Sequence, residues 1–427
     1  MLSRKITLHG SFKGPGKKRA PDSLKTLLDF FPNLQHLQFS DVFAGIPSAI
    51  CDVCLEKVAS LGITYNSRWR AKKNPTLQTP LLIELNVLTH FSLESSPWRE
   101  LHGSCRRFDL NAEFIVESHY LTQIVRGMNE NAESLALPME TAPLDRMSQL
   151  PWPRIRRLSL HGRYPLVMGA TTLPAVLSRM PTLRSLRIQA AQEHDFSRPR
   201  IWDSSMALSS TALSELESLT IAYPDPEDDI FSVKVPRLRH LSLRDEPRYH
   251  FQLRNWDFVP ISTAAPILTA SECLRILRRM ETPTLTSLEL VYKADASEDT
   301  LLRHISSAYP SLARLELHRY RESDDMIVPH VFIAECLSTI ASLRAVHFNL
   351  DCPETPRVHC KRDDFLESWV ALSHAQAMDI VSVMRRCPIL EYIAVLDPRL
   401  QCCTWVDYHL RGPHDVWVDM DDSECRA

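Results

Sequence analysis

Candidate phosphate-binding residues stand near the start of the sequence. Gly10, Gly14 and Gly16 are followed by Lys17 and Lys18, between an apolar strand pattern and a helical pattern. A phosphate loop needs four residues between its outer glycines, followed by Lys and a hydroxyl residue that binds Mg²⁺. Here five residues separate Gly10 from Gly16, and Lys18 takes the hydroxyl position. The spacing therefore indicates a basic surface loop and predicts no nucleotide cofactor.

The cysteines offer two candidate zinc clusters. Cys51 and Cys54 have the C-x-x-C spacing of zinc sites, but no second pair follows at a matching distance. The helical pattern around them places both on one face, which favours buried reduced thiols. Cys352, His359 and Cys360 form a looser group in a polar segment. We predict no metal site at either place.

Familiar catalytic motifs are absent from the sequence. Neither the H-E-x-x-H pattern of zinc proteases nor the G-x-S-x-G pattern of serine hydrolases occurs. The chain has only 10 glycines against 29 prolines, and loops that bind cofactor phosphates need glycine where the backbone approaches the ligand. We therefore predict that the chain is not an enzyme, with no catalytic residues and no cofactor.

The composition narrows the class of partner and the compartment. Of the 427 residues, 44% are hydrophobic and 24% are charged, and the formal net charge is −3. Because neither sign dominates, the overall charge indicates neither a nucleic-acid nor a membrane partner. No signal peptide is visible, and no apolar stretch reaches the roughly 18 residues of a membrane span. With 11 scattered cysteines, we expect a cytoplasmic or nuclear protein with reduced thiols.

One apolar phrase recurs along the sequence: an apolar residue, two variable residues, a second apolar residue, one variable residue and a third apolar residue. Seven clear copies follow a proline by two places, and their prolines are Pro32, Pro153, Pro181, Pro236, Pro283, Pro310 and Pro388. Weaker or partial copies have their middle apolar residue at Ile6, Leu61, Phe91, Leu135, Leu219 and Val346. These 13 candidates recur at a mean step of about 32 residues, slightly above the roughly 20–29 usual for leucine-rich repeats.

This phrase predicts an α/β fold, a leucine-rich-repeat solenoid. The apolar residues of L-x-L lie on one side of a short strand and the variable residue on the other. Stacked copies then form a parallel sheet with a shared core. Helical spacing over residues 173–180 and 301–308 predicts return helices, each ended by a proline. We predict a horseshoe, with parallel strands on the concave face and helices and irregular loops on the convex face.

Longer gaps between copies hold further elements. Residues 114–128, 271–280 and 373–387 have helical patterns, whereas residues 248–260 and 352–364 are polar and predict loops on one rim. We predict a degenerate solenoid of about 13 repeats over residues 1–400. A C-terminal capping segment and acidic tail follow over residues 401–427, where Trp and Val residues are expected to cover the last repeat.

The repeated phrases, the helix–proline–strand junctions, the span of roughly 400 residues and the Trp-containing C-terminal end resemble fungal F-box/leucine-rich-repeat proteins. The resemblance covers nearly the whole chain. It implies the substrate receptor of an SCF-type ubiquitin ligase, in which an F-box docks on a Skp-type adaptor. No F-box is recognisable, because the first strand pattern at Lys5 follows Met1 almost directly. The resemblance therefore implies adaptor binding only if an F-box lies upstream.

The sequence departs from the family in its turns. Typical leucine-rich repeats place Asn or Cys three residues after the last Leu of the strand, where it bonds to the backbone inside the turn. Here only Asn66 occupies that place, and Arg163, Lys293 and Tyr320 stand at equivalent positions. Irregular turns are expected.

The variable positions beside the leucines are the candidate protein-binding residues. Those we predict on the concave face are Arg187, His240, Arg244, Glu289, Arg314, Glu316, His318 and His347. We expect an unidentified protein or peptide partner with acidic and aromatic features, and no nucleic acid or membrane. Replacing Arg244, Arg314 and His318 together is expected to weaken binding without lowering stability. The alternative function is a non-ligase scaffold, or a truncated relative, that binds no adaptor.

Overall fold

The structure is a computed structural model of the chain. It describes residues 5–9, 31, 33–42, 58–65, 87–94, 110–165, 172–192, 198–202, 213–249, 266–322, 327–352, 363–397, 404–411 and 415–421. The glycine-containing loop at residues 10–18 and the Cys51/Cys54 pair lie outside the described residues, as do His359 and Cys360.

The chain divides into two compact units. Unit 1 consists of Met1–Gln192 and Arg200–Leu216, and unit 2 consists of Glu193–Pro199 and Glu217–Ala427. The proposed extent of one solenoid over residues 1–400, with a capping segment after it, stays a prediction.

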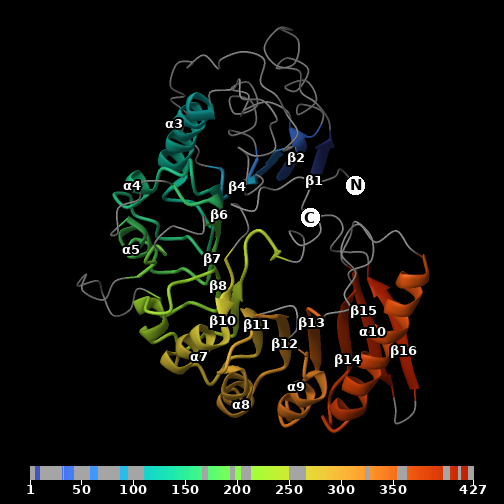
Figure 1. The fold of residues 1–427 in the computed structure, drawn as a ribbon. Helices are drawn as coiled ribbons and strands as arrows, with labels where there is room; N and C mark the ends of the chain where they lie inside the picture. The colour runs from blue at the N-terminus through green and yellow to red at the C-terminus, as the bar shows by residue number, and fades with distance from the viewer. Residues whose placement is uncertain are drawn as a thin grey trace. The chain divides into compact units, whose positions relative to one another are not determined.

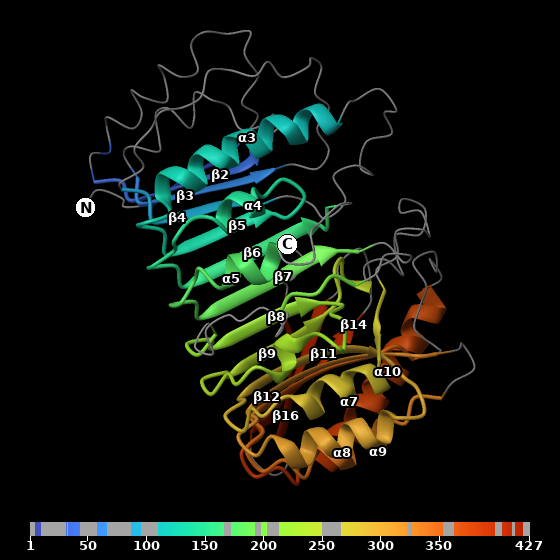
Figure 2. The same ribbon diagram turned by 90° about the vertical axis from the view of Figure 1, so that its left-hand side faces the viewer.

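Unit 1 contains a sheet of parallel strands in chain order, with helices on one of its faces (Figures 1 and 2). Its strands are β1 (Lys5–His9), β2 (His36–Val42), β3 (Ser60–Tyr65), β4 (His90–Glu94), β5 (Ser134–Pro138), β6 (Arg157–Arg163) and β7 (Ser185–Ala191). Its described helices are α3 (Leu110–Met128), α4 (Leu144–Met147) and α5 (Thr172–Leu177).

Unit 2 repeats this arrangement of parallel strands and return helices. Its sheet contains β8 (Ser218–Ala222), β9 (His240–Arg244), β11 (Ser287–Lys293), β12 (Arg314–Tyr320), β13 (Ala345–Leu350) and β14 (Tyr392–Asp397), all parallel and in chain order. The short strand β10 (Leu268–Thr269) pairs with the end of β11. Between the strands lie the 3₁₀ helix η1 (Asp229–Ser232), α7 (Ala270–Arg279), α8 (Glu298–Ala308), α9 (His330–Leu337) and α10 (Asp363–Met384).

The strands stack in the register that the apolar phrase predicts. In unit 1 the middle apolar residues pair from strand to strand in the order Ile6, Leu37, Leu61, Phe91, Leu135, Leu158 and Leu186. In unit 2 the corresponding order is Leu219, Leu241, Leu288, Leu315, Val346 and Ile393. From Leu37 onward all of these side chains are buried. All 13 predicted copies thus form strands, and both units have the α/β fold of a leucine-rich-repeat solenoid.

The proline of the phrase lies in a tight turn between the preceding segment and the strand. The first leucine of the phrase donates its N–H to the carbonyl three residues earlier, which places proline second in a four-residue turn. Proline suits that position because its fixed φ matches the turn geometry. The bonds are Leu183 to Met180, Leu238 to Val235, Leu285 to Thr282 and Leu312 to Tyr309, at 3.0–3.2 Å.

Carboxylates satisfy backbone groups in the turns that follow several strands, where typical leucine-rich repeats use Asn. Glu140 accepts the N–H of Arg163 at 3.0 Å, and Asp351 accepts that of Arg321 at 3.1 Å. Gly162 has a φ of +85°, and a Cβ there would lie 2.3 Å from the carboxylate of Glu140. The expected irregular turns are thus present, and glycine is required where this carboxylate approaches the backbone.

One charged pair lies inside the core of unit 2. Arg319 of β12 is 1% exposed and donates to both carboxylate oxygens of Glu298, in the first turn of α8, at 2.6 and 3.0 Å. The hydroxyl of Tyr292 donates to the same carboxylate at 3.0 Å. This bidentate pair connects the end of a strand to the start of a return helix.

A hairpin of opposite direction ends the sheet of unit 2. Strand β15 (Thr404–Arg411) runs antiparallel to β14, and β16 (Asp415–Asp421) runs antiparallel to β15. Trp405 is buried against Ala394 and Leu396, on the face of the sheet that carries the variable residues. Tyr408 is also buried, and its hydroxyl lies 3.4 Å from His374 of α10. Tyr408, rather than Trp405, therefore covers the helix side of the last repeat.

The predicted helices at residues 114–128, 271–280 and 301–308 are present as α3, α7 and α8. Helix α9 lies in a segment for which we predicted no helix. No helix among the described residues is long and apolar enough to cross a membrane.

Candidate functional site

The variable face of unit 2 carries a row of polar side chains in strand register. Ser242 of β9 pairs with Glu289 of β11, Glu289 with Glu316 of β12, and Glu316 with His347 of β13. Glu289 and Glu316 stand opposite each other on adjacent strands. Because neighbouring strands lie about 4.8 Å apart, their carboxylates are close together. Like charges directly opposite each other destabilise a sheet, and the row therefore needs a cation between them.

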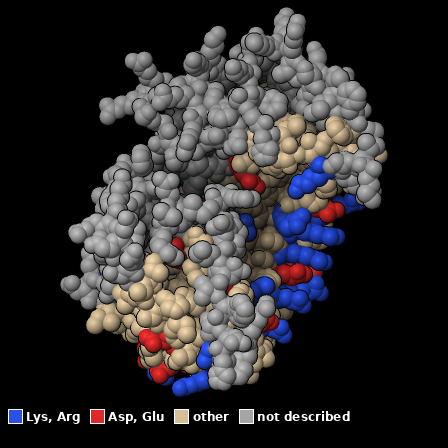
Figure 3. Space-filling view, turned by 90° about the vertical axis from the view of Figure 1, so that its right-hand side faces the viewer, with Lys and Arg blue, Asp and Glu red and all other residues tan. Residues whose placement is uncertain are grey.

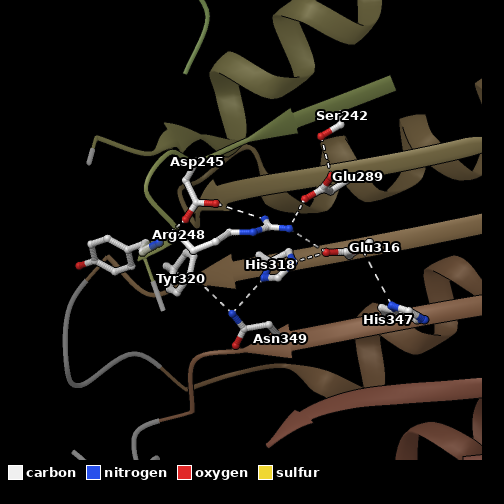
Figure 4. A network of polar contacts seen from close by, with 10 residues as sticks. Ser242, Asp245, Arg248, Glu289, Glu316, His318, Tyr320, His347 and Asn349 are labelled. Carbon is white, nitrogen blue, oxygen red and sulfur yellow. Dashed lines mark hydrogen bonds and ion pairs between the residues drawn. The ribbon is translucent and has the colours of Figure 1, made fainter. Parts of the chain in front are cut away.

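Arg248 supplies this cation from the segment that follows β9 (Figure 4). Its guanidinium lies 2.6 Å from the carboxylate of Glu289 and 3.3 Å from those of Glu316 and Asp245. The side chain of Arg248 is 11% exposed. Burial alone would lower its pKa, but the three carboxylates hold it above its usual value. Arg248 is therefore a permanent charge in this face.

The two carboxylates are ionised at neutral pH. Burial would raise the pKa of Glu289, but the charges of Arg248 and Arg244 lower it. Burial also opposes ionisation of Glu316, but the hydrogen bond from His318 and the charges of His318 and Arg248 lower its pKa to about 2. Ser242 donates to the second oxygen of Glu289 at 2.6 Å. The network thus fixes both carboxylates in position.

His318 is locked between hydrogen-bond partners. Its Nε2 lies 2.7 Å from Glu316, and the amide of Asn349 lies 3.1 Å from its Nδ1 and 3.0 Å from the hydroxyl of Tyr320 (Figure 4). These contacts hold the ring of His318 in the orientation in which Nε2 faces Glu316. The ring of Tyr249 packs edge-on against Tyr320 at 4.7 Å.

An aromatic group adjoins the network on its C-terminal side. The ring of His347 lies 4.8 Å from that of Trp405 and 5.7 Å from that of Tyr392. The imidazole of His347 lies 3.9 Å from Glu316. The rings of His347, Trp405 and Tyr392 therefore flank the two carboxylates on the C-terminal side of the sheet.

Between these side chains lies a hollow of about 200 Å³. It is lined on the variable face by Thr220, His240, Ser242, Ser287, Glu289, Arg314, Glu316, Ala345, His347 and Tyr392. Burial, followed by the charges of Arg314 and Arg239, lowers the pKa of His240. His240 therefore contributes a neutral ring to the hollow at neutral pH.

Three side chains of the polar network have the ligand types of a metal site. Glu289, Glu316 and His318 each place one ligand atom within 4.8 Å of the others. The guanidinium of Arg248, however, contacts both carboxylates. We therefore assign the carboxylates to the ion network, which leaves no opening between them for a cation.

Of the eight predicted binding residues, five line the hollow. They are His240, Glu289, Arg314, Glu316 and His347. Arg244 is half-buried at the end of β9, and Arg187 is exposed on β7 of unit 1. His318 is 1% exposed, and its direct contact with a partner stays a prediction. Alternation placed its side chain on the correct face, but other segments cover that face at this position.

Sequence reasoning missed several parts of the site. Arg248 and Asp245 belong to no repeat phrase, and Tyr392 and Trp405 were not among the predicted binding residues. The cluster Arg244–Asp245–Glu246, followed by Arg248, is the signal that could have indicated a charged segment folding back on the sheet.

We expect Glu316 to make stability depend on pH. A lowered carboxyl pKa stabilises the fold above the unfolded value, near 4.5, and this contribution is lost as the pH falls toward about 2. The shift corresponds to about 3 kcal/mol. Urea denaturation at pH 6, 4 and 2.5 should therefore show a smaller loss for Glu316→Gln than for the unchanged chain. Glu335→Gln, at an exposed position on α9, serves as the control, and equal losses in all three proteins would contradict the expectation.

No protein-family model and no curated protein matches the chain. Among solved structures, a chain of the TLR13 complex with the single-stranded RNA ssRNA13 is 13% identical, with a TM-score of 0.33 over 77% of this chain and 34% of that one. A chain of the yeast Rad7–Elc1 complex is 16% identical, with a TM-score of 0.36 over 70% of this chain and 72% of that one. The present chain thus spans about a third of the chain it matches in the TLR13 complex.

Proposed function

We propose that this chain is a protein-recognition module, and that a segment of its partner lies across strands β9 and β11–β14 with one side chain in the hollow. The observation that carries the proposal is the hollow itself, lined by polar side chains from successive strands and backed by Arg248. The volume of about 200 Å³ is below the roughly 300–1,000 Å³ of sites for small molecules. A single side chain of a larger partner suits that size.

The order of the hollow supports recognition. Glu289 is held by Arg248 and Ser242, and Glu316 by Arg248 and His318. Side chains that are already fixed lose little conformational entropy when a partner binds. The same residues mix donors, acceptors and aromatic rings, which suits a polypeptide segment with its own backbone donors and acceptors.

The protonation state of the carboxylates favours binding over catalysis. A general acid or base works best with a pKa near the operating pH. The pKa of Glu316 is about 2, and that of Glu289 is also lowered. Both groups remain ionised and already accept hydrogen bonds, so neither is poised to exchange a proton at neutral pH.

The resemblance to fungal F-box/leucine-rich-repeat proteins extends this proposal to ubiquitination. In that reading the bound partner is the substrate of an SCF-type ligase. Mixing the purified chain with a Skp-type adaptor in size-exclusion chromatography tests the extension. Co-elution would support it, whereas separate elution of an adaptor that binds a control F-box protein would leave the chain as a non-ligase scaffold.

Filling the hollow tests the recognition site directly. Ser287 lines the hollow at the start of β11, and Ser287→Trp should block a partner's side chain. Ser307→Trp is the matched control, because Ser307 is exposed on α8, on the helix face of the sheet. Affinity capture from a fungal lysate with the proteasome inhibited should recover a protein with the unchanged chain and the control that is lost with Ser287→Trp. Identical sets of proteins from all three baits would contradict the proposal.

A further inference from the structure

One carboxylate oxygen of the hollow is open to a hydrogen-bond donor from outside the chain. Glu316 lines the hollow, and its side chain is 26% exposed. Its Oε1 lies 3.3 Å from the guanidinium of Arg248 and 2.7 Å from Nε2 of His318 (Figure 4). Its Oε2 accepts no hydrogen bond from the part of the chain that the structure describes. Nδ1 of His347 lies 3.9 Å from this oxygen, which is too far for a hydrogen bond.

Further acceptors stand beside this oxygen. In the sheet Glu289 pairs with both Glu316 and Ser242, and all three residues line the hollow. The hydroxyl of Ser242 donates its proton to Glu289 at 2.6 Å, so its lone pairs remain able to accept a hydrogen bond. The pKa values of both carboxyl groups are lowered, so both are ionised at neutral pH. Strands β9, β11 and β12 thus give the hollow acceptors and negative charge.

The C-terminal side of the hollow is aromatic. Tyr392 of β14 and His347 of β13 line it, and their ring centroids are 5.7 Å apart. Burial raises the pKa of Tyr392, so its phenol is neutral at neutral pH. The face of such a ring attracts a cation within about 6 Å. The carboxylates and the aromatic side of the hollow therefore favour the same kind of occupant, a positively charged group.

Other side chains suit this lining less well. An acidic side chain would stand beside two ionised carboxylates, and an apolar one would remove water from Oε2 of Glu316 without replacing its hydrogen bonds. A guanidinium binds best through two hydrogen bonds to one carboxylate, but Oε1 of Glu316 already faces Arg248 and His318. An ammonium group is compact and can bond to single acceptors. The lining therefore favours lysine over arginine.

Arg314 is the charge in the lining that opposes a cation. It stands two residues before Glu316 on the same face of β12, about 6.6–6.8 Å along the strand. Its side chain is exposed, so water and salt screen its repulsion. Figure 3 shows that Lys and Arg side chains also gather in a row along one side of the molecule. Such a surface does not attract a basic peptide, so selection for lysine has to come from the hollow.

We propose that the hollow binds a lysine side chain of the partner segment. Its ammonium group donates to Oε2 of Glu316 and to the hydroxyl of Ser242, and its stem lies against the ring of Tyr392. This inference rests on the proposed recognition function and names the side chain that the hollow selects. It differs from the acidic partner expected from the sequence pattern, because the hollow contains two ionised carboxylates and the pKa of His240 is lowered.

A display library of random peptides, panned against the full-length chain, tests this inference. Peptides that bind the unchanged chain but not Ser287→Trp use the hollow, and they should share a lysine. Fluorescence anisotropy of one such peptide measures the preference. Replacing its lysine with norleucine or Glu should weaken binding about tenfold or more, because a charge-assisted hydrogen bond is lost. Replacing it with Arg should weaken binding less, since the charge is kept.

A variant of the chain tests the same contact from the other side. Glu316→Gln keeps the size of the side chain and removes its charge, so it should bind the lysine peptide about tenfold more weakly. The norleucine peptide should lose less. Glu335→Gln, at an exposed position on α9, changes the net charge equally and should bind the lysine peptide within about twofold of the unchanged chain. Melting temperatures above the assay temperature establish that each variant is folded, and the peptide series on the unchanged chain needs no variant.

Three outcomes would overturn the inference. Hollow-dependent peptides that lack lysine, or that tolerate norleucine in its place, would assign the hollow to another side chain and leave the recognition function standing. A library without any peptide that distinguishes the unchanged chain from Ser287→Trp would contradict recognition at the hollow itself. Equal losses in Glu316→Gln and Glu335→Gln would mean that net charge, rather than Glu316, attracts the lysine.

Discussion

Replacing Arg248 with Met should lower the free energy of unfolding by about 3–5 kcal/mol, because it leaves buried carboxylates without their cation. Glu289 and Glu316 are neighbours across two strands, and Arg248 contacts both. Urea denaturation followed by circular dichroism measures the effect. Arg275→Met, in a surface pair with Glu227 whose side chains are 55% and 57% exposed, should cost less than about 1 kcal/mol.

Neutralising the carboxylates should recover most of this loss. In Arg248→Met/Asp245→Asn/Glu289→Gln/Glu316→Gln none of the three carboxylates that contact Arg248 is left charged without it, so stability should return toward that of the unchanged chain. This variant would keep the hollow but lack the ion network behind it. If Arg248→Met and Arg275→Met were equally stable, the ion network would not stabilise the variable face.

Arg319→Met should have a comparable effect, about 3–5 kcal/mol, in the core rather than on the variable face. It removes the bidentate donor of Glu298, whose side chain is only 12% exposed. Thermal and urea denaturation should show the loss, and Arg319→Met/Glu298→Met should be more stable than the single variant. Arg303→Met breaks an exposed pair on the same helix and serves as control. A double variant no more stable than Arg319→Met would contradict the role of the unpaired carboxylate.

The fold was predictable because short, local sequence patterns determine its strands and turns. Each apolar phrase specifies one strand, and prolines stand in the described turns before four of these strands. Stacking then needs only that middle apolar residues meet, as Leu288 meets Leu315 and Leu315 meets Val346. A pattern that repeats along the chain predicts both the strands and their register.

The site was only partly predictable because two of its parts come from outside the repeat. Alternation identified Glu289, Glu316 and His347 as variable-face residues. It gave no information about Arg248, which reaches the face from an irregular segment, or about Trp405, which reaches it from an antiparallel strand. The ring of Trp405 packs against His318 at 5.8 Å, so a residue on the correct face is nevertheless buried. Coverage of a sheet by distant segments leaves no periodic signal in the sequence.

The antiparallel hairpin of β15 and β16 has a consequence for how this array changes in length during evolution. A duplicated repeat brings a parallel strand, which needs a parallel neighbour where it inserts. At the far side of β14 the neighbour runs in the opposite direction, so a copy placed there would have to displace the hairpin. Between β8 and β14 each strand has parallel neighbours. Gain or loss of repeats is therefore expected within that stretch, while the hairpin is inherited as a fixed terminus.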